Sequence, residues 1–171
     1  MLKTSIEEAL NAQINAEIFS SYLYLSMSSW FDNQGLPGFK SWMETQAQEE
    51  MTHATKLISF LQERGGSLVL EAIEKPQASW SDVLDVFKAT LRHEQYVTSR
   101  VNDLVDLAIA ERDHATNNFL QWFVSEQVEE EANVGEILDQ IRLMEGSGHG
   151  MYMMDKELGS RPAIFTMPAG D

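Results

Sequence analysis

Apolar side chains recur every three or four residues along most of this 171-residue chain, and no stretch of comparable length alternates apolar and polar positions. The first spacing places apolar side chains on one face of an α-helix, whereas alternation would predict strands. Glycine and proline stand mostly between the periodic stretches, and Gly135 is the exception inside one. The pattern predicts an all-α protein built from long amphipathic helices.

The helix ends can be placed from capping and breaking residues. Thr4 or Ser5 is expected to cap the first helix, and Gly65-Gly66 ends the second. Residues 67–80 contain Pro76 and lack helical periodicity, so they form a long connection. The long helices are expected over about residues 4–31, 37–64, 81–111 and 114–145, and a short fifth helix over about 151–159.

The lengths of the connections predict how these helices pack. Short turns join the first helix to the second and the third to the fourth, so each pair should be antiparallel. The connection over 67–80 can span the whole bundle when it is extended. We therefore expect one domain over residues 1–171, a four-helix bundle with one long crossover connection and a short C-terminal helix, followed by a flexible tail over 161–171.

Polar residues interrupt the apolar face of every long helix. A single glutamate at such a position usually extends to solvent, and a single histidine is usually a core residue with a partner. Interruptions on all four helices at matching levels instead favour one common interior site. The interrupting residues are Glu17 on the first helix, Glu50 and His53 on the second, Glu94 on the third, and Gln127 and Glu130 on the fourth.

Four carboxylates in an apolar interior cannot all stay ionised, because desolvation and mutual repulsion raise their pKa values. Two divalent cations would neutralise them, and Glu50 and His53 place an oxygen and a nitrogen ligand on adjacent turns. Bundles that hold two irons or two manganese ions carry single glutamates on two helices and Glu-x-x-His on the others. This chain departs on the fourth helix, which carries Gln127 and Glu130. The ligand set suits Fe(II), Mn(II) or Zn(II).

Further candidate residues border the inward set. Tyr24 lies two turns along the first helix from the inward glutamate, where it could simply pack, hydrogen-bond a ligand or supply an electron. Acidic runs are usually solvated, but Glu49, Glu126 and Glu129 could also form a peripheral cation site. His93 lies off the inward faces and is expected to be solvated.

The composition is acidic and lacks cysteine. With 27 acidic and 12 basic residues the net charge is −15, which opposes binding to nucleic acid or anionic membranes and favours cations. The absence of cysteine excludes disulfides, thiolate zinc sites and iron–sulfur clusters. The acidic start lacks the apolar run of a signal peptide, and no stretch reaches the ~20 apolar residues of a membrane span. A soluble cytoplasmic protein is expected.

Sequence motifs are spread from about Ile6 to Leu158. They are Asn15-Ala16-Glu17, Tyr22-Leu23-Tyr24-Leu25, Gln48-Glu49-Glu50-Met51-Thr52-His53, His93-Glu94, Phe119-Leu120-Gln121-Trp122 and Ser125-Glu126-Gln127-Val128-Glu129-Glu130-Glu131. Together they resemble the ferritins, specifically the bacterial and archaeal non-haem ferritins. The resemblance implies a hollow 24-subunit shell that oxidises Fe(II) with O2 or H2O2 at a di-iron ferroxidase centre within each subunit and stores Fe(III) as a mineral.

The resemblance also implies roles for individual residues. The first iron would be bound by Glu17, Glu50 and His53. Glu50 would bridge to a second iron completed by Glu94 and Glu130, with Gln127 nearby and Tyr24 beside the centre. A third iron site, known in prokaryotic members, would use Glu49, Glu126, Glu129 and Glu130.

Some relatives fit less well. Bacterioferritin has a second Glu-x-x-His on its fourth helix, where this chain has Gln127 and Glu130. Met51 matches its haem-ligating methionine, but non-haem members carry the same Glu-Met-Thr-His string, so haem is not expected. The 12-subunit mini-ferritins take ligands across a subunit interface and lack a fifth helix, unlike the expected arrangement here.

Two other functions stay open. One is a di-iron peroxidase or oxygenase resembling rubrerythrin, although such proteins often need a cysteine-bound electron donor that this chain lacks. The other is a metal-free helical interaction module. Particle size and retained iron separate storage from the first alternative, and Fe(II) binding under nitrogen tests the second.

Overall fold

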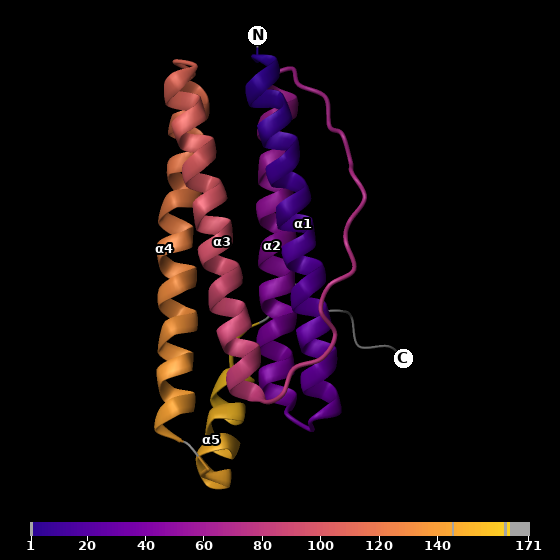
Figure 1. The fold of residues 1–171 in the computed structure, drawn as a ribbon, viewed down its shortest axis with the longest axis vertical. Helices are drawn as coiled ribbons and strands as arrows, with labels where there is room; N and C mark the ends of the chain where they lie inside the picture. Colours follow the sequence, from indigo (N-terminus) through magenta and orange to yellow (C-terminus); the bar gives the residue numbers. More distant parts are fainter. Residues whose placement is uncertain (1, 145, 163, 165–171) are drawn as a thin grey trace.

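The computed structural model describes residues 2–144, 146–162 and 164, and within them it confirms the helical fold without any strand. Four long helices lie side by side as rods, and a short fifth helix lies at one end of the bundle (Figure 1). The helices are α1 (Thr4–Asn33), α2 (Pro37–Glu63), α3 (Val83–Ala110), α4 (His114–Leu143) and α5 (Gly148–Leu158).

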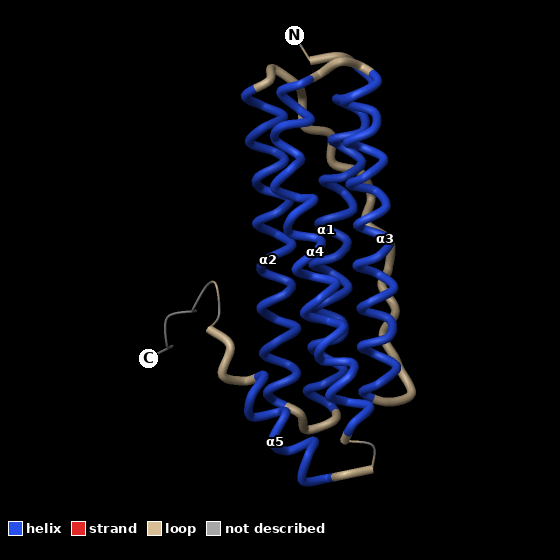
Figure 2. The backbone as a smooth tube through the Cα atoms, turned by 90° about the vertical axis from the view of Figure 1, so that its left-hand side faces the viewer, coloured by secondary structure: helices blue, strands red, loops and turns tan. Residues whose placement is uncertain are grey.

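The connection between α2 and α3 runs the full length of the bundle (Figures 1 and 2). It is attached to α1, where Asn11 accepts a 2.8 Å hydrogen bond from the Val69 amide and Ser26 donates one of 2.7 Å to the Gln77 carbonyl. Because the chain returns to the end at which α2 began, α2 and α3 are parallel, whereas α1–α2 and α3–α4 are antiparallel. The predicted single long crossover is confirmed.

The expected cap of α1 is wrong. The N-cap residue is Lys3, whose side chain makes no capping bond, and the Ser5 hydroxyl instead donates 3.1 Å to the Glu111 carboxylate. Lys3 also pairs with Glu111 at 2.7 Å. The start of α1 is thus attached to the end of α3 by tertiary contacts that sequence-local capping rules do not include.

Two apolar clusters fill the bundle, one toward each end. The cluster near α5 contains Phe31 stacked on Phe39 at 5.1 Å between ring centroids, with Phe87 against both rings. The opposite cluster contains Ile6 and Leu57, both fully buried. A layer of polar side chains lies between the clusters, and its position is therefore fixed by apolar packing on both sides.

Helix α5 is docked on the start of α2 by a side-chain cap from a distant part of the chain. An Asp155 carboxylate oxygen accepts hydrogen bonds from the backbone amides of Gly38 at 2.8 Å and Phe39 at 3.1 Å. A Cβ atom at Gly38 would lie 1.6 Å from the Asp155 carbonyl oxygen, so only glycine permits this approach. The tail expected over 161–171 falls mainly on 163 and 165–171, which lie outside the described residues.

We predict that Asp155→Ala loosens α5. Losing a buried N-cap should lower the free energy of unfolding by about 1 kcal/mol, because two helix-end amides lose their acceptor. Hydrogen exchange of residues 148–158 should accelerate as well. The control is Asp139→Ala, which removes an exposed ion pair with Arg142. Equal protection of α5 in Asp155→Ala and wild type would contradict the docking role.

Candidate metal centre

The polar layer at mid-bundle receives side chains from all four long helices. Each member is at most 5% exposed, although the layer contains four carboxylates. The members that the sequence predicted are Glu17 on α1, Glu50 and His53 on α2, Glu94 on α3, and Gln127 and Glu130 on α4. Ionisable groups at this depth need partners or counter-charges.

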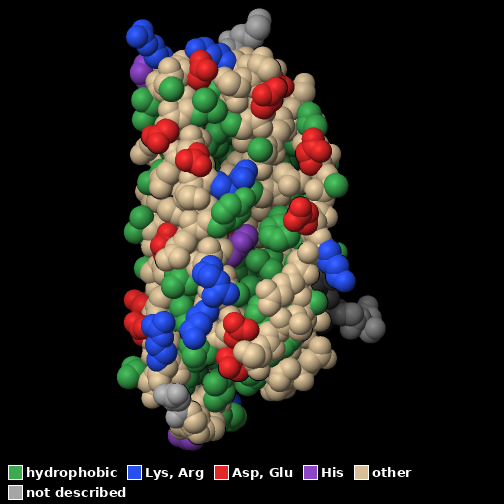
Figure 3. Space-filling model, in the orientation of Figure 1, with side chains coloured by type: hydrophobic (Ala, Val, Ile, Leu, Met, Phe, Trp, Pro, Cys, Tyr) green, Lys and Arg blue, Asp and Glu red, His purple; other side chains and the backbone are tan. Residues whose placement is uncertain are grey.

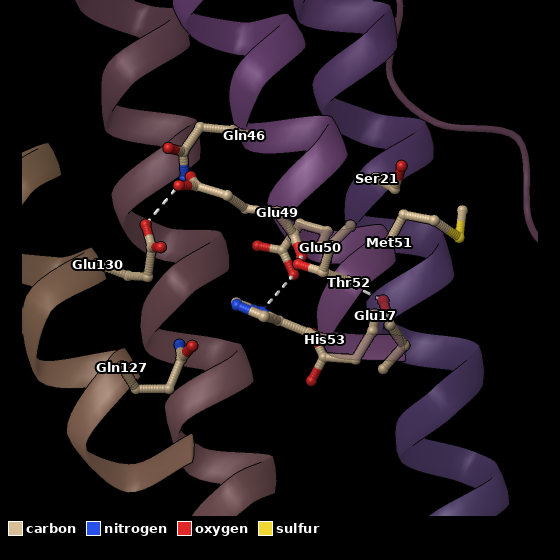
Figure 4. A network of polar contacts seen from close by, with 12 residues as sticks. Glu17, Ser21, Gln46, Glu49, Glu50, Met51, Thr52, His53, Gln127 and Glu130 are labelled. Atoms are coloured by element: carbon tan, nitrogen blue, oxygen red, sulfur yellow. Dashed lines mark hydrogen bonds and ion pairs between the residues drawn. The ribbon is translucent and has the colours of Figure 1, made fainter. Parts of the chain in front are cut away.

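Glu17, Glu50 and His53 converge on one point. One ligand atom from each lies within 4.8 Å of the others, and within the described chain no other histidine or acidic residues form such a group of three. The His53 Nδ1 atom is 3.5 Å from a Glu50 oxygen and 3.9 Å from a Glu17 oxygen. Figure 4 shows Glu50 and His53 pointing toward the space faced by Gln127 and Glu130 from α4.

Two carboxylate oxygens in this group lack hydrogen-bond partners. One oxygen of Glu17 accepts from Gln13 at 2.7 Å, but its Oε2 atom and the Oε2 atom of Glu50 are buried and accept no hydrogen bond. Unsatisfied buried carboxylate oxygens are costly unless a cation is present. They are positioned as metal ligands, so the residues fit a bound divalent ion.

The α3 and α4 side of the layer is held by hydrogen bonds. The Tyr24 hydroxyl donates a short hydrogen bond to one Glu94 oxygen, and the Gln127 side-chain amide donates a hydrogen bond of 3.2 Å to the other. Glu130 accepts 2.8 Å from the Gln46 amide (Figure 4). These neutral donors orient the carboxylates without neutralising them.

Burial and repulsion from neighbouring carboxylates raise the pKa values of Glu50, Glu94 and Glu130. Burial, followed by the charges of Glu94 and Glu17, raises the pKa of Glu50 well above its usual range. Burial raises the pKa of Glu94 to about 7 and that of Glu130 to about 8. Burial and the neighbouring carboxylates also raise the pKa of the Tyr24 hydroxyl. The layer therefore holds protons until a cation replaces them.

The peripheral candidates are arranged differently. Glu49 is paired with Arg161 at 2.7 Å, Glu126 is half-buried, and Glu129 is exposed. These three do not form a converged ligand group with other histidine or acidic residues of the described ranges. Their role as a third iron site stays a prediction.

Sequence reasoning missed several supporting residues. Gln13 lies four residues before its partner Glu17, a spacing that could have identified it. Gln46 binds Glu130 on another helix, which local spacing does not indicate. His93 was expected to be solvated, but it is half-buried and has a hydrogen-bond partner. Its ring is 2.8 Å from the Ser20 hydroxyl and 6.2 Å between centroids from the Tyr24 ring, and burial lowers its pKa to about 4.

The outer surface shows no comparable concentration of acids on the face visible in Figure 3, where acidic side chains are scattered along the bundle. Met51, the residue at the haem-ligand position, is 44% exposed and points away from the polar layer (Figure 4). No helix among the described residues is long and apolar enough to cross a membrane.

Comparison with known proteins agrees with the fold. A ferritin-like domain model matches residues 7–144. The bacterial non-heme ferritin of Campylobacter jejuni is 42% identical over 91% of this chain and 93% of that protein, and that of Bacteroides fragilis is 42% identical over 94% and 100%. The open pore ferritin of Archaeoglobus fulgidus is 48% identical, with a TM-score of 0.94 over 95% of this chain and 100% of that chain.

The fold and the interior polar layer thus define a helical-bundle protein with a carboxylate-rich core. The chain belongs to the ferritin family. The resemblance predicted from the motifs is confirmed, as is the fold class.

We predict that the metal-free protein loses stability as pH rises. Folding raises the pKa values of Glu94 and Glu130 above 4.5, so these groups hold more protons in the folded state than in the unfolded state. Their contribution to the free energy of unfolding is therefore lost as pH rises from about 4.5 to about 8. With a chelator present, the thermal midpoint should be lower at about pH 8.5 than at about pH 6.

Glu130→Gln is the matched variant, because its amide oxygen can still accept from Gln46 but it cannot ionise. Its midpoint should fall less over the same interval. A wild-type midpoint that rises with pH, or an equal fall in both proteins, would contradict the assignment.

Proposed function

We propose that this chain is an iron-storage ferritin that oxidises Fe(II) to Fe(III) inside each subunit and stores the product as a mineral. The observation that carries the proposal is the pair of buried carboxylate oxygens, on Glu17 and Glu50, that have no hydrogen-bond partner beside His53. Family membership supports the same conclusion, since the relatives from Campylobacter jejuni and Archaeoglobus fulgidus are named ferritins.

The ligand residues divide into two groups. Glu17, Glu50 and His53 would hold one ferrous ion. Glu94 and Glu130 would hold a second, with Glu50 shared between the ions and Gln127 alongside. Carboxylates favour the harder ferric ion over the ferrous one, so this donor set makes oxidation more favourable.

Two ferrous ions together supply two electrons, which with two protons reduce O2 to H2O2 or H2O2 to water. The chain's own groups manage the protons. The raised pKa values of Glu50, Glu94 and Glu130 mean that protons leave these carboxyls when iron enters. Tyr24 holds one oxygen of Glu94 and would keep that ligand oriented, and it is close enough to the centre to supply an electron.

Other parts of the proposal follow from the family. We expect a cytoplasmic homo-oligomer of 24 subunits, no haem, and a third iron near Glu49, Glu126, Glu129 and Glu130. The relatives from Campylobacter jejuni and Bacteroides fragilis are named non-heme ferritins, which supports the absence of haem.

The first test removes ligands. Glu50→Ala and His53→Ala should each lower the initial rate of Fe(II) oxidation by at least about 100-fold, because an incomplete site cannot hold two irons together. The rate is measured by absorbance of the ferric product under air. Glu63→Ala, an exposed position on the same helix, is the control and should oxidise Fe(II) normally.

Each variant is first shown to fold and assemble by circular dichroism and light scattering. A folded His53→Ala protein with the wild-type rate would overturn the role of His53.

The second test distinguishes storage from a rubrerythrin-like peroxidase or oxygenase. A shell of 24 subunits of 19.4 kDa should have a mass of about 470 kDa by light scattering. It should retain far more than two irons per chain after aerobic loading. A dimer with two irons per chain would favour the alternative, and no tight Fe(II) binding under nitrogen would favour a metal-free module.

A further inference from the structure

Arg161, in the segment that follows α5, reaches the border of the polar layer. One guanidinium nitrogen donates to both oxygens of Glu49, at 2.8 and 2.7 Å. The other terminal nitrogen donates a short hydrogen bond to the Gln46 side-chain oxygen, and the guanidinium lies 5.5 Å from the centre of the Trp42 ring. The Arg161 and Glu49 side chains are only 27% and 24% exposed, so this pair is partly shielded from solvent.

The contact with Gln46 continues into the interior. An amide side chain has one acceptor end and one donor end. Since Arg161 occupies the acceptor end, the donor end faces α4 and binds a Glu130 oxygen at 2.8 Å. Arg161 thereby fixes Glu49 directly and one oxygen of Glu130 through Gln46.

Glu49 and Glu130 are two of the four carboxylates expected at the third iron site, so one positive side chain already occupies part of that site. A guanidinium and a metal ion cannot bind the same two oxygens at once. They compete for the same lone pairs, and their positive charges repel each other.

We propose that Arg161 is an internal counter-ion that competes with metal for the third site. It keeps the metal affinity of this site low while the interior pair of sites is filled. An ion that binds Glu49 must displace Arg161. Loss of the Arg161 contact releases Gln46, which in turn frees the Glu130 oxygen that Gln46 had bound. Arg161 is a positioning residue, and this inference rests on the proposed function.

The test is calorimetric titration of the assembled, metal-free protein with Zn(II), which binds similar ligands without oxidation. In Arg161→Gln, the affinity for the ion beyond the interior pair should rise at least about tenfold, while the affinity of the site formed by Glu17, Glu50 and His53 stays unchanged. Arg161→Lys keeps the charge but not the two-nitrogen fork and should lie between wild type and Arg161→Gln. Arg142→Gln, which removes an exposed arginine paired with Asp139, should behave as wild type.

A merely structural role for Arg161 would lower stability without raising metal affinity. In the double variant Arg161→Gln/Glu49→Gln the gain should disappear, since the released ligand is absent. Third-site affinities within twofold of each other in wild type and Arg161→Gln, with interior sites intact, would overturn this inference alone. A wild-type protein that binds no Zn(II) at the interior sites would overturn the proposed function, and this inference with it.

Discussion

The structure depends on burying negative charge at the centre of an otherwise apolar bundle. Glu17, Glu50, Glu94 and Glu130 come from four different helices and are nearly inaccessible to solvent. Desolvation makes each carboxylate costly, and proximity makes the set costlier still. Such an arrangement is tolerable when protons or metal ions balance the charge. The same feature that weakens the fold is therefore the one that we propose to bind iron.

The rest of the fold serves to hold this layer in place. Apolar clusters on both sides fix its level, and the long crossover attached to α1 makes α2 and α3 parallel, so that their glutamates meet at mid-bundle. Hydrogen bonds from neutral donors then orient individual carboxylates, as the bond from the Gln127 amide orients Glu94. Two oxygens of the set accept no hydrogen bond, which leaves them for a cation.

Periodicity and breakers predicted the helices and the crossover, because these depend on local sequence and chain length. The interior glutamates were also predictable, since polar residues on an apolar stripe are conspicuous. The attachment of Ser5 to Glu111, the contact of His93 with Ser20 and the contact of Arg161 with Glu49 were not. Each joins residues more than 70 positions apart, and nothing in local spacing encodes such a pairing. The third iron site stays a prediction, because its acids do not converge among the described residues.

Anomalous diffraction at the iron absorption edge, from crystals soaked anaerobically with ferrous salt, tests the central claim most directly. We expect two strong peaks per subunit in the polar layer, one among Glu17, Glu50 and His53 and one beside Glu94 and Glu130. An empty layer in crystals that bind iron only at surface acids would contradict it.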